Sequence, residues 1–261
     1  MATHIAGKLS RVSIERHGGW ARIVLSHPPV NVIDVPLMEE LNQELARVES
    51  DDGLSVVVFS GAGRSFSAGV DVAAHTPDKV EEMLTKFHAV IRAVIASRKI
   101  TIAAVHGSCL GGGAELAMTC DMVYTADSAT WGFPEINLGC YPPVAATALA
   151  ALIGQKQAAD LILTGRTIDG REAAAMGLAN RAVRLEQLDA AVTACTDQLT
   201  MLSAAALAVA KKAIYAWDSV HFDKGLARAE KIYLEELLKT RDTREGIEAF
   251  LQKRKPQWTG R

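Results

Sequence analysis

Short apolar runs alternate with longer stretches of helical periodicity through the first half of the 261-residue chain. Residues 10–15 alternate polar and apolar side chains, and Gly18-Gly19 separates them from an apolar run at 21–25. This pattern predicts an opening β-hairpin. Apolar residues then recur at helical spacing over 36–48, and residues 56–59 are typical of a short buried strand.

The same order of elements follows once more. The spacing predicts a helix over 77–96, a strand over 100–105, a helix over 115–120 that begins after a glycine triplet, and a strand over 122–124. Strand and helix therefore alternate, which favours an α/β fold in which helices connect the strands of one sheet.

The pattern changes after Pro143. Residues 144–213 are rich in Ala, Leu and Ile and carry little strand signal beyond Ala182-Val183, and residues 226–251 predict charged amphipathic helices. No stretch of linker composition divides the chain. We therefore predict an α/β core over 1–195 and a helical C-terminal region over 196–261, both parts of one functional unit.

Composition narrows the classes of function. Apolar residues make up 49% of the chain, which is enough for a substantial core. The net charge of −2 argues against a nucleic-acid partner, although a local basic patch for a phosphate is still compatible with it. The apolar runs are too short to span a membrane, and the first eleven residues carry no targeting pattern. We expect a cytoplasmic protein without a membrane partner.

The cysteines and histidines carry no metal or disulfide pattern. Cys109, Cys120, Cys140 and Cys195 lack C-x-x-C spacing, which favours buried thiols in a reducing compartment. His75, His88 and His106 lack the spacing of metal ligands, and surface or hydrogen-bonded structural roles are expected for each. We therefore expect no metal.

The triplet Gly111-Gly112-Gly113 lies between a buried strand and a helix. Glycine lets a ligand approach the backbone, and the N–H groups that enter a helix have no partner within it. Such a turn suits a phosphate or a carbonyl oxygen that gains negative charge. A tight strand-to-helix turn explains the triplet alone equally well. Residues 65–71 form a second small-residue loop after a buried strand, which is weaker evidence for the same kind of site.

Two carboxylates lie in apolar surroundings. Glu115 stands at the start of a helix among Ala, Leu and Met, and Glu135 stands in a loop among aromatic and aliphatic residues. A buried carboxylate is unfavourable unless it is paired or functional. Each alone would more often be a salt-bridged core acid. Together, with one strand between them, they predict a shared cleft.

These segments resemble, in order and spacing, the motifs of the enoyl-CoA hydratase (crotonase) superfamily. Residues 65–71 resemble its F-x-x-G-x-D loop, residues 104–117 are similar to its A-V-x-G-x-x-x-G-G-G-x-E-L-A signature, and residues 131–139 match F-G-x-P-E-x-x-L-G with Trp131 in place of Phe. Residues 246–255 resemble its closing helix. The resemblance implies a spiral of ββα units with a helical C-terminal region, assembled as a homotrimer or a dimer of trimers.

The resemblance also implies the ligand and the roles of the site residues. The family binds acyl-CoA thioesters, so coenzyme A is part of the substrate and no separate cofactor is expected. The N–H groups of Val70 and Gly112 would form the oxyanion hole. Glu115 would orient and deprotonate water, and Glu135 would deliver a proton to carbon. Residues implied to contact substrate are Ala68, Asp71, Gly111, Tyr141 and Pro142, with Phe250 and Lys253 contacting the CoA of a neighbouring subunit.

The stretch after Gly139 departs from the usual family pattern. Common hydratases have a Pro, a Gly-Gly pair and an Arg there, whereas residues 140–147 read Cys-Tyr-Pro-Pro-Val-Ala-Ala-Thr. This wall, the loop at 74–78 and residues 233–237 look most like the family members that hydrate cyclohexa-1,5-diene-1-carbonyl-CoA.

The sequence leaves alternatives open. The chain is expected to be a hydro-lyase that adds water to a conjugated enoyl- or dienoyl-CoA. A straight-chain enoyl-CoA hydratase or an enoyl-CoA isomerase would use the same site. A non-catalytic CoA- or RNA-binding relative is the alternative from another class, because a fold does not fix function.

Overall fold

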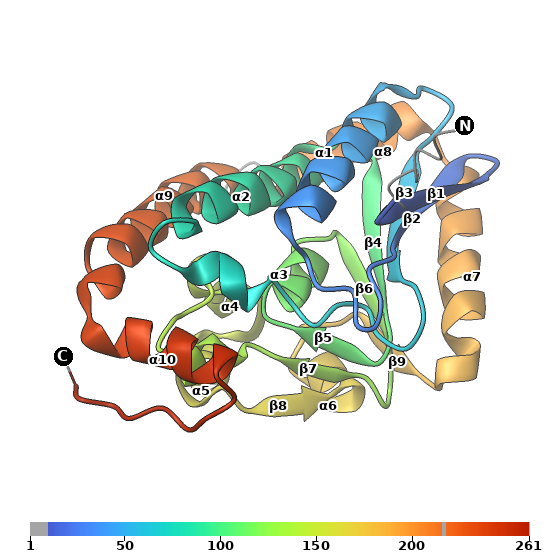
Figure 1. Ribbon diagram of the computed structural model, residues 1–261. Coiled ribbons are helices and arrows are strands. Elements are labelled where there is room, and N and C mark those ends of the chain that lie inside the picture. The colour runs from blue at the N-terminus through green and yellow to red at the C-terminus, as the bar shows by residue number, and fades with distance from the viewer. Residues whose placement is uncertain (1–9, 216–217, 261) are drawn as a thin grey trace, which may run out of the picture.

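The computed structural model describes residues 10–215 and 218–260 (Figure 1). Its strands are β1 Val12–His17, β2 Trp20–Leu25, β3 Val56–Gly61, β4 Ile100–Val105, β5 Ser108–Leu110, β6 Met122–Ala126, β7 Thr130–Gly132, β8 Thr167–Asp169 and β9 Arg181–Val183. Its α-helices are α1 Val35–Ser50, α2 Val80–Ala96, α3 Gly112–Met118, α4 Pro143–Ile153, α5 Gln155–Thr164, α6 Gly170–Ala175, α7 Leu188–Thr200, α8 Ala204–Tyr215, α9 Asp218–Glu235 and α10 Arg241–Leu251. Four short 3-10 helices are η1 Val72–His75, η2 Pro134–Leu138, η3 Leu185–Gln187 and η4 Leu237–Lys239.

A six-stranded sheet in the order β1-β2-β3-β4-β6-β9 forms the body. The hairpin β1-β2 is antiparallel, and each later neighbour pair is parallel. Parallel neighbours require long connections, which α1, α2 and α3 supply. The predicted hairpin and the predicted alternation of strand and helix are therefore confirmed.

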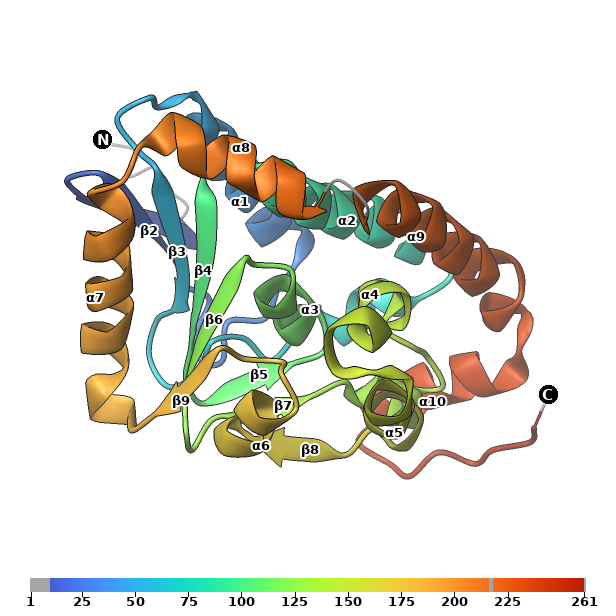
Figure 2. The same cartoon turned by 180° about the vertical axis from the view of Figure 1, so that it is seen from behind.

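Both faces of this sheet are covered. Val57 and Phe59 of β3 pack into the larger core beside α1 and α2, while Val56 and Val58 pack into a second core beside α7 (Figures 1 and 2). Burial on both faces explains why the central strands are continuous apolar runs without polar alternation.

A smaller sheet, β5-β7-β8, lies beyond the ends of the larger one (Figure 2). Each of its strands has three residues, which is too short to give a periodic signal, and the sequence did not predict them. The helix predicted over 115–120 begins earlier, at Gly112, and ends at Met118. Glycine is a poor helix former, so the sequence pattern did not indicate that α3 begins within the glycine triplet.

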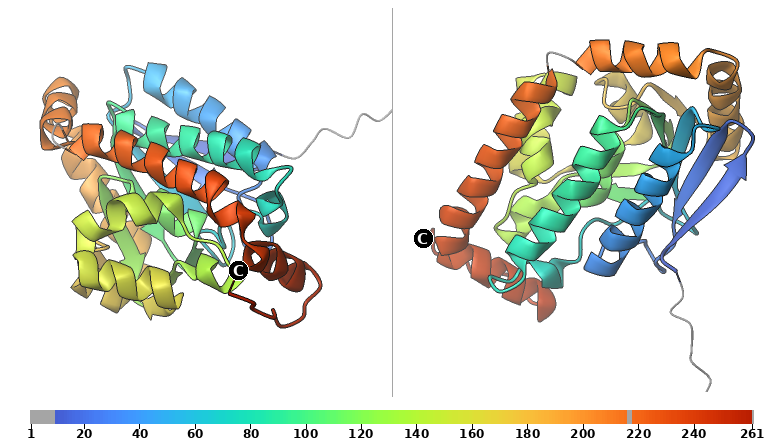
Figure 3. Two further views of the ribbon diagram at one scale, coloured as in Figure 1. Left: turned by 90° about the vertical axis from the view of Figure 1, so that its left-hand side faces the viewer. Right: turned by 90° about the horizontal axis from the view of Figure 1, so that it is seen from above.

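The C-terminal helices leave the body after α7, and the predicted boundary at residue 195 lies inside that helix. Helix α9 runs alongside α2 and α4, and α10 returns towards η2 and η1 (Figures 1 and 3). In the described part of the chain, no single helix is long and apolar enough to cross a membrane, and residues 185–200 and 204–215 reach that length only as a pair bent by 107°.

A buried ion pair fixes α8 to the sheet. Lys211 Nζ lies 2.8 Å from Asp121 Oδ2, and the two side chains are 5% and 10% exposed. Lys211 Nζ also donates to Lys99 O. Removal of one partner of a buried pair leaves the other charge uncompensated. We expect Lys211→Met to lower the free energy of unfolding by about 3 kcal/mol in urea denaturation. The exposed neighbour variant Lys212→Met is the control, and an equal loss in both variants would contradict this explanation.

Candidate active site

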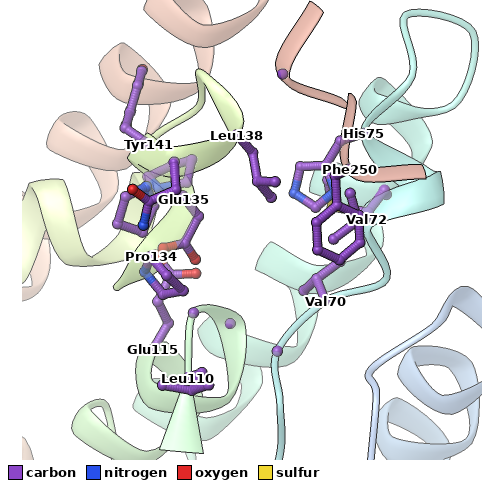
Figure 4. Close-up of a pocket in the computed structure, with 18 of the residues that line it drawn as sticks. Val70, Val72, His75, Leu110, Glu115, Pro134, Glu135, Leu138, Tyr141 and Phe250 are labelled. Atoms are coloured by element: carbon purple, nitrogen blue, oxygen red, sulfur yellow. The ribbon is translucent and has the colours of Figure 1, made fainter. Parts of the chain in front are cut away.

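A cavity of about 380 Å³ opens between the body and the C-terminal helices. Its lining comes from five parts of the chain, namely the loop before η1 together with η1, helix α2, the turn into α3, the segment from η2 to α4, and helices α9 and α10 with the chain after α10. Segments far apart in sequence therefore meet around one space. Figure 4 shows the side chains at its centre.

Glu115 lies in the first turn of α3 and is 3% exposed. Its Oε1 accepts a hydrogen bond from the Ala145 N–H at 2.9 Å. Burial raises the pKa of Glu115 to about 7, although the backbone N–H groups of Ala145 and Val144 favour the charged form. This carboxyl group therefore changes charge near neutral pH.

Glu135 lies in the first turn of η2. Its Oε2 is buried and has no hydrogen-bond partner among the described residues. Burial, and then the charge of Glu115, raise the pKa of Glu135 to about 8. The carboxylates of Glu115 and Glu135 point towards each other across a short gap (Figure 4). Like charges at this separation resist ionising together, so the pair holds one proton over a range of neutral pH.

Two backbone N–H groups lie near this pair. The amide of Val70 makes no hydrogen bond in the described chain, whereas the next amide, that of Asp71, donates to Ile33 O. Gly112 is the first residue of α3, where a helix leaves its N–H groups unpaired. A Cβ placed on Gly112 would lie 3.4 Å from the Val70 nitrogen. The two amides are thus neighbours, and an oxygen that gains negative charge can bind between them.

The glycines of this turn are needed for close approach. Gly111 has a φ of +50°, and a Cβ there would lie 2.5 Å from Glu135 Oε1. A Cβ on Gly112 would lie 2.6 Å from Val70 Cγ2. Side chains at either position would enter the space between the carboxylates and the two amides, which explains why the sequence has glycine at both.

An apolar wall faces the acids. Val70, Val72, His75 and Phe250 lie across the cavity from Glu115 and Glu135 (Figure 4). Val72 and His75 belong to η1, which Asp71 caps by accepting a hydrogen bond from the Ala73 N–H. Burial lowers the pKa of His75, which keeps this ring neutral on the apolar side.

The structure brings together most of the residues that the sequence predicted for the site. Those that line the cavity are Ala68, Val70, Gly111, Gly112, Glu115, Glu135, Tyr141, Pro142 and Phe250. Asp71 instead caps η1, and the exposed Lys253 lies just after α10; neither lines the cavity. Phe250 lines the cavity of its own chain, and its predicted contact with a neighbouring subunit stays a prediction, as does that of Lys253.

Sequence reasoning missed several lining residues on distant helices. His88 on α2, Tyr233 on α9 and Arg254 after α10 also line the cavity. His88 had been assigned only a surface or structural role. Its hydrogen bond with Glu230 does have a structural character, but the cavity on its other side had no local signal in the sequence. Tyr233 belongs to residues 233–237, which stand out in the sequence only through their resemblance to those of family members.

Comparison with known proteins gives a consistent result. Residues 15–261 match the family model described as "Enoyl-CoA hydratase/isomerase". The chain is 34% identical over 252 residues to a cyclohexa-1,5-dienecarbonyl-CoA hydratase of Thauera aromatica, which covers 96% of this chain and 97% of the relative. It is also 34% identical over 253 residues to a probable enoyl-CoA hydratase of Mycobacterium bovis, with 96% and 98% covered.

The fold agrees with solved structures of the same group. An enoyl-CoA hydratase from Mycobacterium avium subsp. paratuberculosis superposes with a TM-score of 0.87 at 26% identity, covering 97% of this chain and 100% of that one. The predicted fold class, an α/β crotonase fold with C-terminal helices, is confirmed. The chain belongs to the enoyl-CoA hydratase/isomerase family, the crotonase superfamily.

Proposed function

We propose that this protein is a hydratase that adds water to a conjugated enoyl- or dienoyl-CoA thioester, with cyclohexa-1,5-diene-1-carbonyl-CoA as its substrate. The observation that carries this proposal is the pair of buried carboxylates, Glu115 and Glu135, that face each other beside the Val70 and Gly112 amides. A relative of that activity is 34% identical over nearly the whole chain. The apolar wall opposite the acids suits a hydrocarbon acyl group.

The proposed reaction uses the two acids in opposite protonation states. Ionised Glu115 takes a proton from water while the water oxygen bonds to a carbon of the conjugated system. The electrons of the broken carbon–carbon π bond move towards the thioester oxygen, which the Val70 and Gly112 N–H groups stabilise as an enolate. Protonated Glu135 then delivers its proton to carbon. One water is consumed, and a proton must pass from Glu115 back to Glu135 before the next turnover.

The electrostatics support this division of roles. Burial raises the pKa of both carboxyl groups, and the charge of Glu115 raises the pKa of Glu135 further, which favours Glu135 as the group that keeps the proton. The hydrogen bond from the Ala145 N–H stabilises the ionised form of Glu115, whereas Oε2 of Glu135 has no such donor. Environments that push the pKa values of two carboxyl groups apart in this way are typical of acid–base pairs.

The test is a substrate panel. Purified protein is incubated with cyclohexa-1,5-diene-1-carbonyl-CoA, crotonyl-CoA and a 3-enoyl-CoA, and products are identified by mass and chromatography. We expect an 18-Da gain on the cyclic dienoyl thioester. Hydration of crotonyl-CoA alone would overturn the cyclic substrate, a shifted double bond without mass gain would indicate an isomerase, and the absence of any conversion would overturn the proposed activity.

The pH dependence follows from the coupled pair. Below about pH 7 both carboxyl groups are protonated and no base is present, and above about pH 8 both are ionised and no acid is present. We therefore expect kcat/KM for hydration to rise with pH towards 7 and to fall above 8. The resulting pH profile is a narrow bell, and its two apparent pKa values belong to the carboxyl pair as a whole. Stopped assays in overlapping buffers from pH 5 to 10 measure it. A flat profile between pH 6 and 9 would contradict a mechanism in which one carboxyl group must be ionised while the other is protonated.

We also propose that the protein assembles as a homotrimer or a dimer of trimers, as the family resemblance implies. Phe250 and Lys253 would then contact the CoA of a neighbouring subunit, as the family resemblance implies. Light scattering after gel filtration measures the assembly. A monomer with full hydratase activity would overturn this proposal.

A further inference from the structure

Three buried polar atoms that line the cavity have no hydrogen-bond partner among the described residues. They are Glu135 Oε2, His88 Nε2 and the Tyr233 hydroxyl. The proposed reaction uses only the first. Buried polar atoms are nearly always paired in folded proteins, so an unpaired one in a cavity indicates a ligand group that it meets.

His88 presents a hydrogen-bond acceptor. Its side chain is 0% exposed, and its Nδ1 lies 2.5 Å from Glu230 Oε1, which also accepts from Arg92 at 3.2 Å. Burial lowers the pKa of His88 more than Glu230 raises it, so the ring is neutral at neutral pH. A neutral ring that faces a carboxylate through Nδ1 carries its proton there, which leaves a lone pair on Nε2.

Tyr233 presents a donor. It is 1% exposed, and its ring packs at 5.3 Å against the ring of Tyr141. Burial and the neighbouring Cys140 and Glu135 raise the pKa of Tyr233 well above its usual range, so the hydroxyl keeps its proton.

Helix α2 contributes His88 to the cavity lining, and helix α9 contributes Tyr233. Glu230 and Tyr233 lie three residues apart on α9 and therefore share one of its faces. The His88–Glu230 hydrogen bond holds α2 against that face, and the two helices run side by side (Figures 1 and 3). His75, the other histidine of the lining, bonds instead to Asp71 O.

We propose that His88 and Tyr233 form a polar subsite that binds a hydroxyl group on the acyl part of the substrate, at a carbon remote from those that take up water. This inference rests on the proposed function, because it assigns the acyl group to this cavity. A hydroxyl both donates and accepts, so it pairs with His88 Nε2 and with the Tyr233 hydroxyl at once. The unsubstituted cyclic dienoyl group leaves both buried atoms unpaired, so a ring that already carries such a hydroxyl is expected to bind more tightly than that group.

Aryl thioesters test the subsite without turnover. Isothermal titration calorimetry compares benzoyl-CoA, 3-fluorobenzoyl-CoA and the 2-, 3- and 4-hydroxybenzoyl-CoA isomers, where fluorine matches a hydroxyl in size but cannot donate. We expect one hydroxy isomer to bind the wild type roughly tenfold or more tightly than benzoyl-CoA or the fluoro analogue. Tyr233→Phe should remove most of that preference, because it deletes only the hydroxyl.

Tyr124→Phe is the matched control, because Tyr124 lies on β6 and does not line the cavity. It should keep the full preference, and His88→Gln serves as a second variant if Tyr233→Phe does not fold. Equal affinity of the wild type for the hydroxy and fluoro analogues, or a preference that survives in Tyr233→Phe, would overturn the subsite. If the protein hydrates the enoyl-CoA thioesters but shows no such preference, the proposed function stands and only the polar subsite fails. If no aryl- or enoyl-CoA binds or reacts, the subsite and the proposed function both fail.

Discussion

Replacing Glu115 or Glu135 with Gln is expected to lower kcat for hydration by ~10²–10⁴ in each single variant, since each substitution removes one proton transfer. Gln is nearly isosteric with Glu and can still accept the hydrogen bond from the Ala145 N–H, so the cavity keeps its shape. Stopped-flow or single-turnover hydration assays measure the loss.

The double variant separates joint action from independent action. If the two acids serve one concerted exchange, Glu115→Gln/Glu135→Gln loses little more than the worse single variant, because groups that act as a unit are not additive. Glu172→Gln is the control, because Glu172 lies on α6, pairs with Arg166 and does not line the cavity. Full activity in either cavity variant would contradict water addition by the pair and would favour an isomerase that needs one acid–base group.

Gly111→Ala is expected to lower kcat about 10²-fold while the protein remains folded. The backbone there has φ +50° and ψ −126°, and the new Cβ would lie 2.5 Å from Glu135 Oε1. The carboxyl group must therefore move, and a displacement of about 1 Å in a reacting group is enough for a loss of this size.

Gly63→Ala gives the matched comparison. Gly63 also has a positive φ, +72°, but a Cβ there meets no atom within 4 Å. Both variants should lose about 1–3 kcal/mol of unfolding free energy from backbone strain, measured by urea denaturation. Only Gly111→Ala should also lose turnover. Equal turnover in the two variants would mean that the turn does not position Glu135.

The sequence predicted the reacting centre better than its surroundings. Glu115, Glu135, Val70 and Gly112 lie in short motifs that resemble those of the family, and the structure gathers them in one cavity. The central strands could also be predicted from the sequence, because burial on both faces produces unbroken apolar runs such as Val56–Gly61.

The rest depends on tertiary contacts between distant residues. His88 and Glu230 are 142 residues apart, and nothing near either residue indicates the other. The three-residue strands β5, β7 and β8 exist because they pair with one another, and such lengths carry no period. Asp71 has a role that its motif did not indicate, because its side chain caps η1, and its predicted substrate contact stays a prediction.

The walls of the cavity come from separate parts of the chain, so substitutions can alter one wall and leave another unchanged. Its acids and amides come from residues 70–135, whereas Tyr233 comes from α9, Phe250 from α10 and Arg254 from the chain after α10. Substitutions in α9 and α10 can therefore reshape the space for the acyl group while the reacting centre stays intact. Exchanging residues 218–260 between two relatives would therefore alter this part of the space for the acyl group and leave the reacting centre unchanged in both hybrids.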